Sequence, residues 1–157
     1  MPSNYERMMQ LAEDTFAVKN DPSQLDVDEE VINHLLKIHP STVSEKDDGD
    51  GPVAWVLLLP TTEKLMHQFL NKEITEKELY ERTPLNEKYD AVYLCSAMVL
   101  EEFRKKGIAK TLTLSALEKI RELHNINYLF VWNFSEEGAA SSISIAKLAA
   151  LPLLIRK

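Results

Sequence analysis

Residues 91–112 read AVYLCSAMVLEEFRKKGIAKTL, and this stretch decides which fold the sequence indicates. It opens with ten uncharged, mostly apolar residues, the pattern of a buried strand, and closes with the start of a helical pattern. Between them stands Gly107, one of only four glycines in the chain, beside Arg104, Lys105 and Lys106. Because glycine permits backbone dihedrals and close approaches that a side chain forbids, its place among cations suggests a backbone shaped to meet an anion.

The residues after this turn continue the pattern into a strand–helix–strand unit. Ala91–Leu100 is the first strand, a strong helix is predicted over Ile108–Leu123, and a second strand over Tyr128–Phe134. Strand, helix and strand with short connections form a βαβ crossover, which favours parallel pairing of the two strands. We therefore expect one α/β domain over residues 1–157, with a mixed, twisted sheet in which these two strands are central neighbours. The apolar stripe of the predicted helix consists of Ala109, Leu112, Ala116, Ile120 and Leu123.

The rest of the chain adds helices and further strands. The run PVAWVLLLP, residues 52–60, is short, bulky and bounded by prolines, as expected of a buried strand. Before it, SEKDDGDGP at residues 44–52 is predicted to be an exposed connection; a calcium loop there would need Lys46 and Leu57 as ligands. A last strand fits Leu151–Arg156. Helices are predicted over Tyr5–Val18, Val27–Ile38, Thr62–Asn71 and Glu76–Arg82.

Composition and charge limit the kinds of molecule that this protein is expected to bind. The chain has 157 residues and a formal net charge of -7, so general attraction to nucleic acid is not expected. A single cysteine, Cys95, cannot form an internal disulfide, which favours a reducing compartment. The N-terminal residues are charged where a signal peptide is apolar, and the most apolar tail, LAALPLLI, is too short to span a bilayer. These features predict a cytoplasmic protein without a membrane partner or a metal site.

The start of the predicted helix at Ile108 offers chemistry suited to an anion. The first backbone N–H groups of a helix have no intrahelical acceptor, and the helix macrodipole adds about half a positive charge at this end. Together with the neighbouring cations, these groups would suit a phosphate or pyrophosphate. The fingerprints of dinucleotide folds and P-loops are absent, so from spacing alone a solvated strand-to-helix turn explains the loop equally well.

A family resemblance favours the anion site. Residues 98–112, MVLEEFRKKGIAKTL, resemble the acyl-coenzyme A signature of the GNAT superfamily of N-acetyltransferases, in which a strand leads through an Arg/Gln-x-x-Gly-x-Gly/Ala loop into a helix. Arg104, Gly107 and Ala109 fill this pattern, with the usual isoleucine at Ile108. The resemblance covers about Ala91–Phe134, and the N-terminal ninety residues match only in the general order of their elements.

The resemblance implies a cofactor, acetyl-coenzyme A or coenzyme A, and a set of residues that would bind it. Backbone groups around Val99 would pair with the pantetheine arm as an added strand does, and loop amides from Arg104 onward would surround the pyrophosphate. Asn133 stands where such proteins often hold a polar residue, and the two strands should splay apart there. The implied cofactor-binding residues are Met98, Val99, Leu100, Arg104, Lys105, Lys106, Gly107, Ile108, Ala109, Lys110 and Asn133.

The sequence also departs from the family pattern. Many members carry a tyrosine, in the helix after the second strand, that protonates the departing thiolate. The corresponding position is Ala140 or Ile145, depending on the alignment, and residues 135–157 contain no tyrosine. The catalytic glutamate of histone-type members corresponds to Tyr93. We therefore assign no catalytic residue from the sequence.

Other chemically capable side chains have simpler interpretations. Cys95 and Tyr93 lie in the middle of a predicted strand and are interpreted as core residues, although Tyr93 could relay a proton. Ser141 and Ser142 could donate to the thiolate, but we predict that they start the last helix.

The leading hypothesis is an N-acetyltransferase that moves an acetyl group from acetyl-coenzyme A to an amine by direct attack in a ternary complex. The alternative is a catalytically degenerate domain of this fold that binds coenzyme A or its acyl form as a sensor or structural module. A third hypothesis is an unrelated α/β interaction domain. Surplus carboxylates favour a cationic small-molecule or peptide amine as acceptor, and a homodimer is left open.

Overall fold

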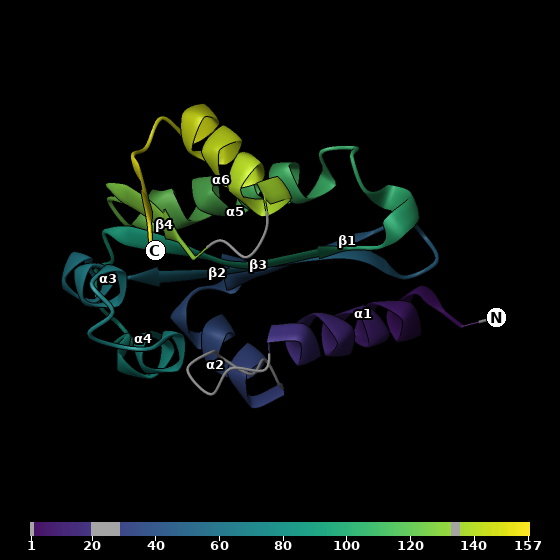
Figure 1. Ribbon diagram of the computed structural model, residues 1–157, viewed down its shortest axis with the longest axis horizontal. Helices are drawn as coiled ribbons and strands as arrows, with labels where there is room; N and C mark the ends of the chain where they lie inside the picture. The colour runs from purple at the N-terminus through teal and green to yellow at the C-terminus, as the bar shows by residue number, and fades with distance from the viewer. Residues whose placement is uncertain (1, 20–28, 133–135) are drawn as a thin grey trace.

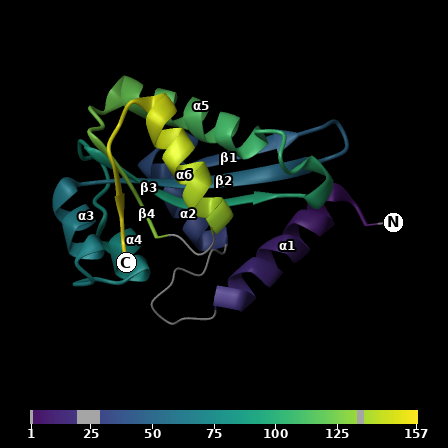
Figure 2. The same cartoon turned by 45° about the horizontal axis from the view of Figure 1, so that its top comes forward.

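The computed structural model describes residues 2–19, 29–132 and 136–157, which form a sheet covered by helices on both faces. Figure 1 shows α5 (Ile108–Leu123) and α6 (Glu136–Ala149) on one face, and the turned view in Figure 2 agrees. The helices from the N-terminal half lie on the other face. These are α1 (Asn4–Lys19), α2 (Glu29–Ile38), α3 (Glu63–Leu70) and α4 (Glu76–Arg82).

In the described part of the chain, five strands form one sheet in the order β1-β2-β3-β4-β5. The first three pair antiparallel, whereas β3, β4 and β5 pair parallel. The parallel pair β3–β4, joined through α5, confirms the predicted crossover and the mixed α/β sheet. The strands are β1 (Val43–Asp47), β2 (Pro52–Thr61), β3 (Ala91–Val99), β4 (Tyr128–Val131) and β5 (Leu153–Ile155).

Most predicted elements are confirmed with small shifts of their ends. The predicted and observed bounds of α4 and α5 agree, and β2 is buried along nearly its whole length because helices cover both of its faces. Local capping fixes the start of α4: the Thr75 hydroxyl accepts from the Glu78 N–H, and the Glu78 carboxylate accepts from the Thr75 N–H. The predicted start of α2 at Val27 and the predicted strand end at Phe134 lie outside the described residues.

The prediction for residues 44–52 was wrong in its first half. Val43–Asp47 form the edge strand β1, which pairs antiparallel with β2, and only the tip of the hairpin is a connection. The Asp47 carboxylate organises that tip by accepting from the N–H groups of Gly49 at 2.7 Å and Gly51 at 3.2 Å. An edge strand exposed to solvent lacks an apolar run, so its polar sequence resembles a loop.

A cluster of aromatic rings fills the core between the sheet and α3. Phe69 on α3 lies with its ring centroid 5.1 Å from that of Tyr93 on β3 and 5.9 Å from that of Phe130 on β4. Tyr93 and Phe130 are themselves stacked at 5.1 Å. A smaller cluster under α1 joins Met8 and Val53 to Met98 and Leu100 at the far end of β3.

Candidate functional site

The two central strands, β3 and β4, are paired over only a short distance. Their register joins Ala91–Tyr93 to Tyr128–Phe130, whereas β3 continues to Val99. A bulge interrupts β3 just beyond its last pair with β4. Leu94 and Ser96 pair with consecutive residues of β2, so the residue between them has no pairing partner in β2. That residue is Cys95. In the described part of the chain, the edge of β3 after Tyr93 therefore has no partner in β4, which agrees with the expected splay.

Near the end of β3, the backbone groups of Val99 point to this open edge. The N–H of Leu100 donates to the Val53 carbonyl at 2.9 Å, which places the Leu100 amide on the β2 side. Since neighbouring residues of a strand direct their amides to opposite sides, Val99 faces the open edge. The Val99 carbonyl accepts there from Nε of Arg104 at 3.0 Å. Backbone capacity for an added strand therefore exists at Val99.

A tight loop then leads into α5 with two residues in left-handed conformation. Lys105 has φ 63°, and Gly107, the N-cap residue of α5, has φ 75° and ψ 14°. Gly107 has no side chain with which to cap this helix end, and the first helical hydrogen bond to Gly107 comes from the N–H of Thr111 at 2.9 Å. The amides of the first turn, from Ile108 to Lys110, thus have no acceptor within the helix.

The loop and the two helices on this face enclose a groove of about 370 Å³. Most of the cofactor-binding residues expected from the sequence line it, and small residues of α6 form its opposite wall. Lining residues are Val99, Phe103, Arg104, Lys105, Gly107, Ile108, Ala109, Lys110, Ala140, Ser141 and Ser144.

Three of the remaining expected residues lie within the described part of the chain, and none of the three lines the groove. Met98 and Leu100 direct their side chains into the small cluster under α1 and are 6% and 4% exposed. The ammonium group of Lys106 lies 5.5 Å from the centroid of the Phe103 ring. Asn133 lies outside the described residues, so its expected place near the cofactor stays a prediction.

A neighbouring ion pair shapes the charge of this region. Nη2 of Arg7, on α1, lies 2.6 Å from Oε1 of Glu102, in the 3-10 turn Glu101–Phe103 that precedes the loop. The hydrogen bond from Arg7 lowers the pKa of the Glu102 carboxyl to about 2. The negative charge closest in sequence to Arg104 is therefore held in an ion pair with α1.

The model of the Acetyltransferase (GNAT) family matches residues 5–141. This chain belongs to the GNAT family of acetyltransferases. The match begins at Tyr5, so the family likeness extends far beyond the Ala91–Phe134 region that carries the sequence resemblance. A search of curated proteins found no match. None of the described helices is long and apolar enough to cross a bilayer.

The wall contributed by α6 was missed by the sequence argument. Ser141 and Ser142 were predicted to start the last helix of this GNAT domain, but α6 begins at Glu136 and both lie inside it. Ser142 is buried and donates to the Gly138 carbonyl at 2.9 Å, whereas Ser141 and Ser144 line the groove. One sequence feature could have indicated this wall: the small residues Ala140, Ser141 and Ser144 are spaced so that they share one face of a helix.

The structure also separates the two alternative positions for the family's tyrosine. Ala140 lines the groove, whereas Ile145 is 6% exposed and belongs to the main core. Of these two positions, Ala140 is therefore the one whose side chain reaches the groove of this GNAT domain, as do those of Ser141 and Ser144.

Tyr93, the position of the histone-type glutamate, is a core residue of this GNAT domain. It is 1% exposed, and its hydroxyl donates to Oε2 of Glu76 on α4. Burial raises the pKa of the Tyr93 hydroxyl well above its ordinary value, and the Glu76 carboxylate raises it further. A hydroxyl that is buried, engaged and hard to ionise is poorly suited to relaying protons.

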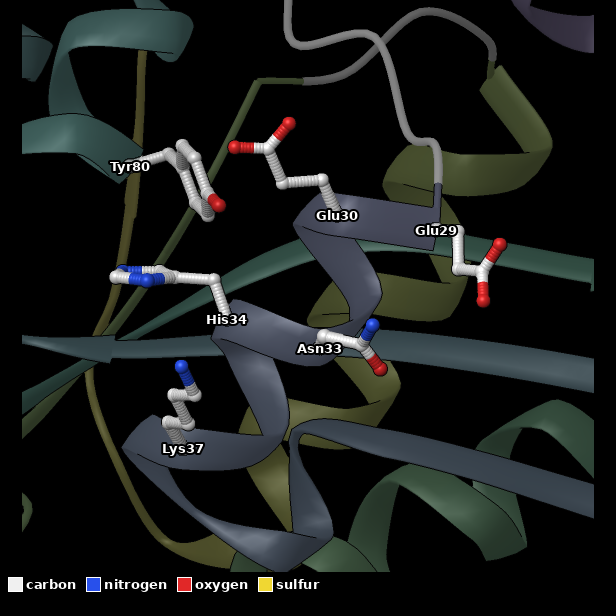
Figure 3. A pocket seen from close by; sticks show the side chains of 6 residues that line it. All are labelled: Glu29, Glu30, Asn33, His34, Lys37 and Tyr80. Carbon is white, nitrogen blue, oxygen red and sulfur yellow. The ribbon is translucent and has the colours of Figure 1, made fainter.

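A second groove, of about 480 Å³, opens between α2 and α4 of the same GNAT domain. Figure 3 shows its side chains, with the Tyr80 ring beside His34 and the Glu30 carboxylate on the same side. The ring centroids of His34 and Tyr80 are 5.0 Å apart in an edge-to-face arrangement. Its lining residues are Glu29, Glu30, Asn33, His34, Lys37 and Tyr80.

Proposed function

We propose that the groove at the start of α5 binds acetyl-coenzyme A and that the protein transfers the acetyl group to an amine. The observation that carries this proposal is the helix start itself. Its first-turn amides have no intrahelical acceptor, and its N-cap residue, Gly107, has no side chain to cap it. A Cβ at Gly107 would meet no atom of the described residues within 4 Å, so these residues leave space for a ligand in front of this backbone.

Charge at the groove supports an anionic ligand. Arg104, Lys105 and Lys110 line it in a chain whose formal net charge is -7. Phosphate oxygens accept strong, charge-assisted hydrogen bonds from such side chains, and the helix macrodipole favours negative charge at the same place. Arg104, Lys105 and the amides of Ile108 to Lys110 are the groups that would hold a pyrophosphate.

The open edge of β3 supplies the second element of the fit. Val99 lines the groove and directs its amide and carbonyl away from β2. An extended amide-containing arm can add to such an edge as a strand does. The carbonyl of Val99 is shared with Arg104 Nε, so a bound arm would displace or share that contact.

The chain's own groups then determine the chemistry. Acetyl-coenzyme A, when bound, supplies an acetyl group activated as a thioester. Backbone donors along the open edge of β3 would stabilise negative charge on the acetyl oxygen, and the walls of the groove would orient the group for attack by an amine. The C–N bond forms as the C–S bond breaks, and the amine proton goes to water. The hydroxyl of Ser141 or Ser144, both of which line the groove, would pass a proton to the departing sulfur and regain one from water.

A second candidate function rests on one specific residue. Ala140 lines the groove and is one of the two positions that could correspond to the family's tyrosine, and neither position holds one. Without that hydroxyl, the domain could bind coenzyme A or its acyl form as a sensor or structural module. Binding of the cofactor is common to both functions, and transfer distinguishes them.

Thermal denaturation with coenzyme A tests the binding step. A ligand of the folded state raises the melting temperature by mass action, and we expect this rise at millimolar ligand. Arg104→Glu/Lys105→Glu should reduce the rise, and added salt should reduce it in the parent protein. Lys119→Glu, on an exposed part of α5 away from the groove, is the control and should leave the rise unchanged. No shift in the parent protein would contradict the proposal.

A further inference from the structure

The side chain of Arg156 has surroundings that the acetyl-transfer proposal leaves unexplained. Arg156 directly follows β5, and its backbone N–H donates to the Val131 carbonyl at 2.9 Å, which holds it at the end of β4. Its guanidinium carbon lies 4.4 Å from the ring centroids of both Phe69 and Trp132. Contacts between a cation and aromatic faces stabilise a guanidinium that has lost part of its hydration.

Two hydrogen-bond donors of this guanidinium have no partner. Nε and Nη1 of Arg156 are buried, and no acceptor lies within hydrogen-bond distance of either atom in the described part of the chain. No ion pair of the described residues includes Arg156. Buried N–H groups of native proteins are nearly always paired, because an unpaired one loses its hydration without compensation. A carboxylate or another strong acceptor would satisfy these donors.

The location of Arg156 relates it to the site of transfer. Tyr93 and Phe130 are the last paired residues of β3 and β4, and Trp132 follows directly after β4. The rings of Tyr93, Phe130 and Trp132 all contact Phe69, so they face α3. Arg156 therefore lies where the two strands part, on the sheet face opposite to α5 and α6. Figures 1 and 2 both show the C-terminus near α3 and α4.

The charge of Arg156 acts on the buried pair of Tyr93 and Glu76. Burial and the Glu76 carboxylate raise the pKa of the Tyr93 hydroxyl, and the guanidinium of Arg156 lowers it. Tyr93 in turn donates to Glu76. The guanidinium thus lies within electrostatic reach of this pair, yet its Nε and Nη1 donate to neither residue.

We infer that Arg156 recognises a carboxylate on the acceptor, so that the acceptor is an amino acid or another amine that also carries a carboxylate. This inference rests on the proposed acetyl transfer and names its acceptor class. The guanidinium presents planar, directed donors that suit a carboxylate better than a point charge does. Arg156 as a whole is only partly buried and follows a three-residue strand at the sheet edge, while its Nε and Nη1 are themselves buried.

Matched acceptor pairs test the recognition during turnover. Glycine, β-alanine and 4-aminobutyrate are each compared with their own amides, so that only the carboxylate differs within a pair. We expect kcat/KM to favour at least one acid over its amide by about tenfold or more. Arg156→Met should bring this ratio close to one, because kcat/KM for the acid falls toward the value for its amide. Arg82→Met removes an exposed positive charge elsewhere and should leave the ratio unchanged.

A binding measurement gives a readout that needs neither acetyl-coenzyme A nor turnover. Trp132 contacts Arg156 directly, so in a Trp55→Phe background its fluorescence reports on this position. N-acetylglycine should change the fluorescence in the millimolar range, whereas N-acetylglycinamide should not. Arg156→Met should abolish the response. Arg156→Lys keeps the positive charge but lacks the planar set of donors of a guanidinium, so it should weaken the response several-fold. If Arg156→Met does not fold, the Arg156→Lys variant tests the role of Arg156 in its place.

The two measurements separate the possible failures. A fluorescence response to the carboxylate without transfer to any amine would overturn the proposed function and leave the carboxylate site in place. Transfer with equal kcat/KM for acids and amides, together with no response to N-acetylglycine, would overturn the role of Arg156 and leave the proposed function standing. In that case ordered water satisfies the two buried donors.

Discussion

The imidazole rings of His39 and His124 lie 6.1 Å apart, inclined at 64°, and both use Nδ1 as a hydrogen-bond acceptor. His39 accepts from the N–H of Ser41 at 3.0 Å, and His124 accepts from the N–H of Tyr89 at 3.2 Å. A ring nitrogen that accepts carries no proton, so this arrangement selects the neutral form of both rings. Burial is the main cause that lowers the pKa of each ring below 6.5.

Acidification should therefore destabilise the fold through this pair. Because both folded-state pKa values are lowered, the unfolded chain binds more protons once the pH falls below about 6.5, and the free energy of unfolding decreases. Urea denaturation at pH 7 and pH 5 measures the loss. His39→Asn/His124→Asn, which keeps a side-chain acceptor near each N–H without a titrating ring, should show a smaller loss. Equal losses in the two proteins would contradict the prediction.

Gly107 and Gly49 allow strain and ligand binding to be separated. Both have positive φ, 75° and 106°, and a Cβ on either would meet no atom within 4 Å among the residues that the structure describes. Alanine at Gly107 should therefore cost backbone strain of about 1–2 kcal/mol rather than a clash inside the protein. Gly49→Ala, in the β1–β2 turn, should be at least as destabilising. Only Gly107→Ala should weaken coenzyme A binding, measured by calorimetry; equal effects of the two substitutions on affinity would argue against the groove.

Tyr93→Phe should impair stability more than catalysis. The substitution removes the hydroxyl that donates to the buried Glu76 carboxylate, at a cost of about 1–3 kcal/mol. The rate of acetyl transfer should change by no more than several-fold, because Tyr93 is enclosed in the core. Tyr93→Phe/Glu76→Gln should recover part of the stability, since a neutral amide is less costly to leave underpaired. A hundredfold loss of rate in a stably folded Tyr93→Phe protein would instead identify an acid.

Ala140 offers a test by gain of function. Ala140→Tyr places a phenol at the groove, where it can protonate a departing thiolate, and should raise the rate of transfer by about tenfold or more. Ala140→Phe provides the same bulk without the hydroxyl and should give no gain. Release of the free thiol measures the rate of transfer in both variants.

In the parent protein the rate of transfer should rise with pH as the acceptor amine loses its proton.

Serine substitutions on α6 test the hydroxyls that the parent protein has. Ser141→Ala/Ser144→Ala should lower the rate of transfer by about tenfold if these hydroxyls supply the proton. Ser142→Ala is the control, because its hydroxyl is bonded to the Gly138 carbonyl inside α6. Equal rates in the parent and in the double variant would assign the proton to water.

Local patterns in the sequence predicted most helices and strands, but such patterns carry no information on contacts between residues distant in sequence. The bounds of α5 could be read because its apolar stripe and the glycine before it both mark the helix. β1 escaped prediction because an exposed edge strand carries no apolar run. The α6 wall of the groove and the contact of Arg156 with Phe69 join residues distant in sequence, and no spacing rule connects them.

The route of the chain between β2 and β3 has a consequence for how such a protein can change. Thr61 pairs with Ala91, so the chain leaves the sheet and returns beside its point of departure, with α3 and α4 in between. A tight turn could close the same hairpin, so strand pairing does not require this excursion. It nevertheless delivers Phe69 and Glu76 to one face, while none of the described residues lining the groove at α5 comes from it. Exchanging residues 62–90 between relatives would therefore change the side chains on the α3 face of the sheet and leave the residues that line the groove at α5 unchanged.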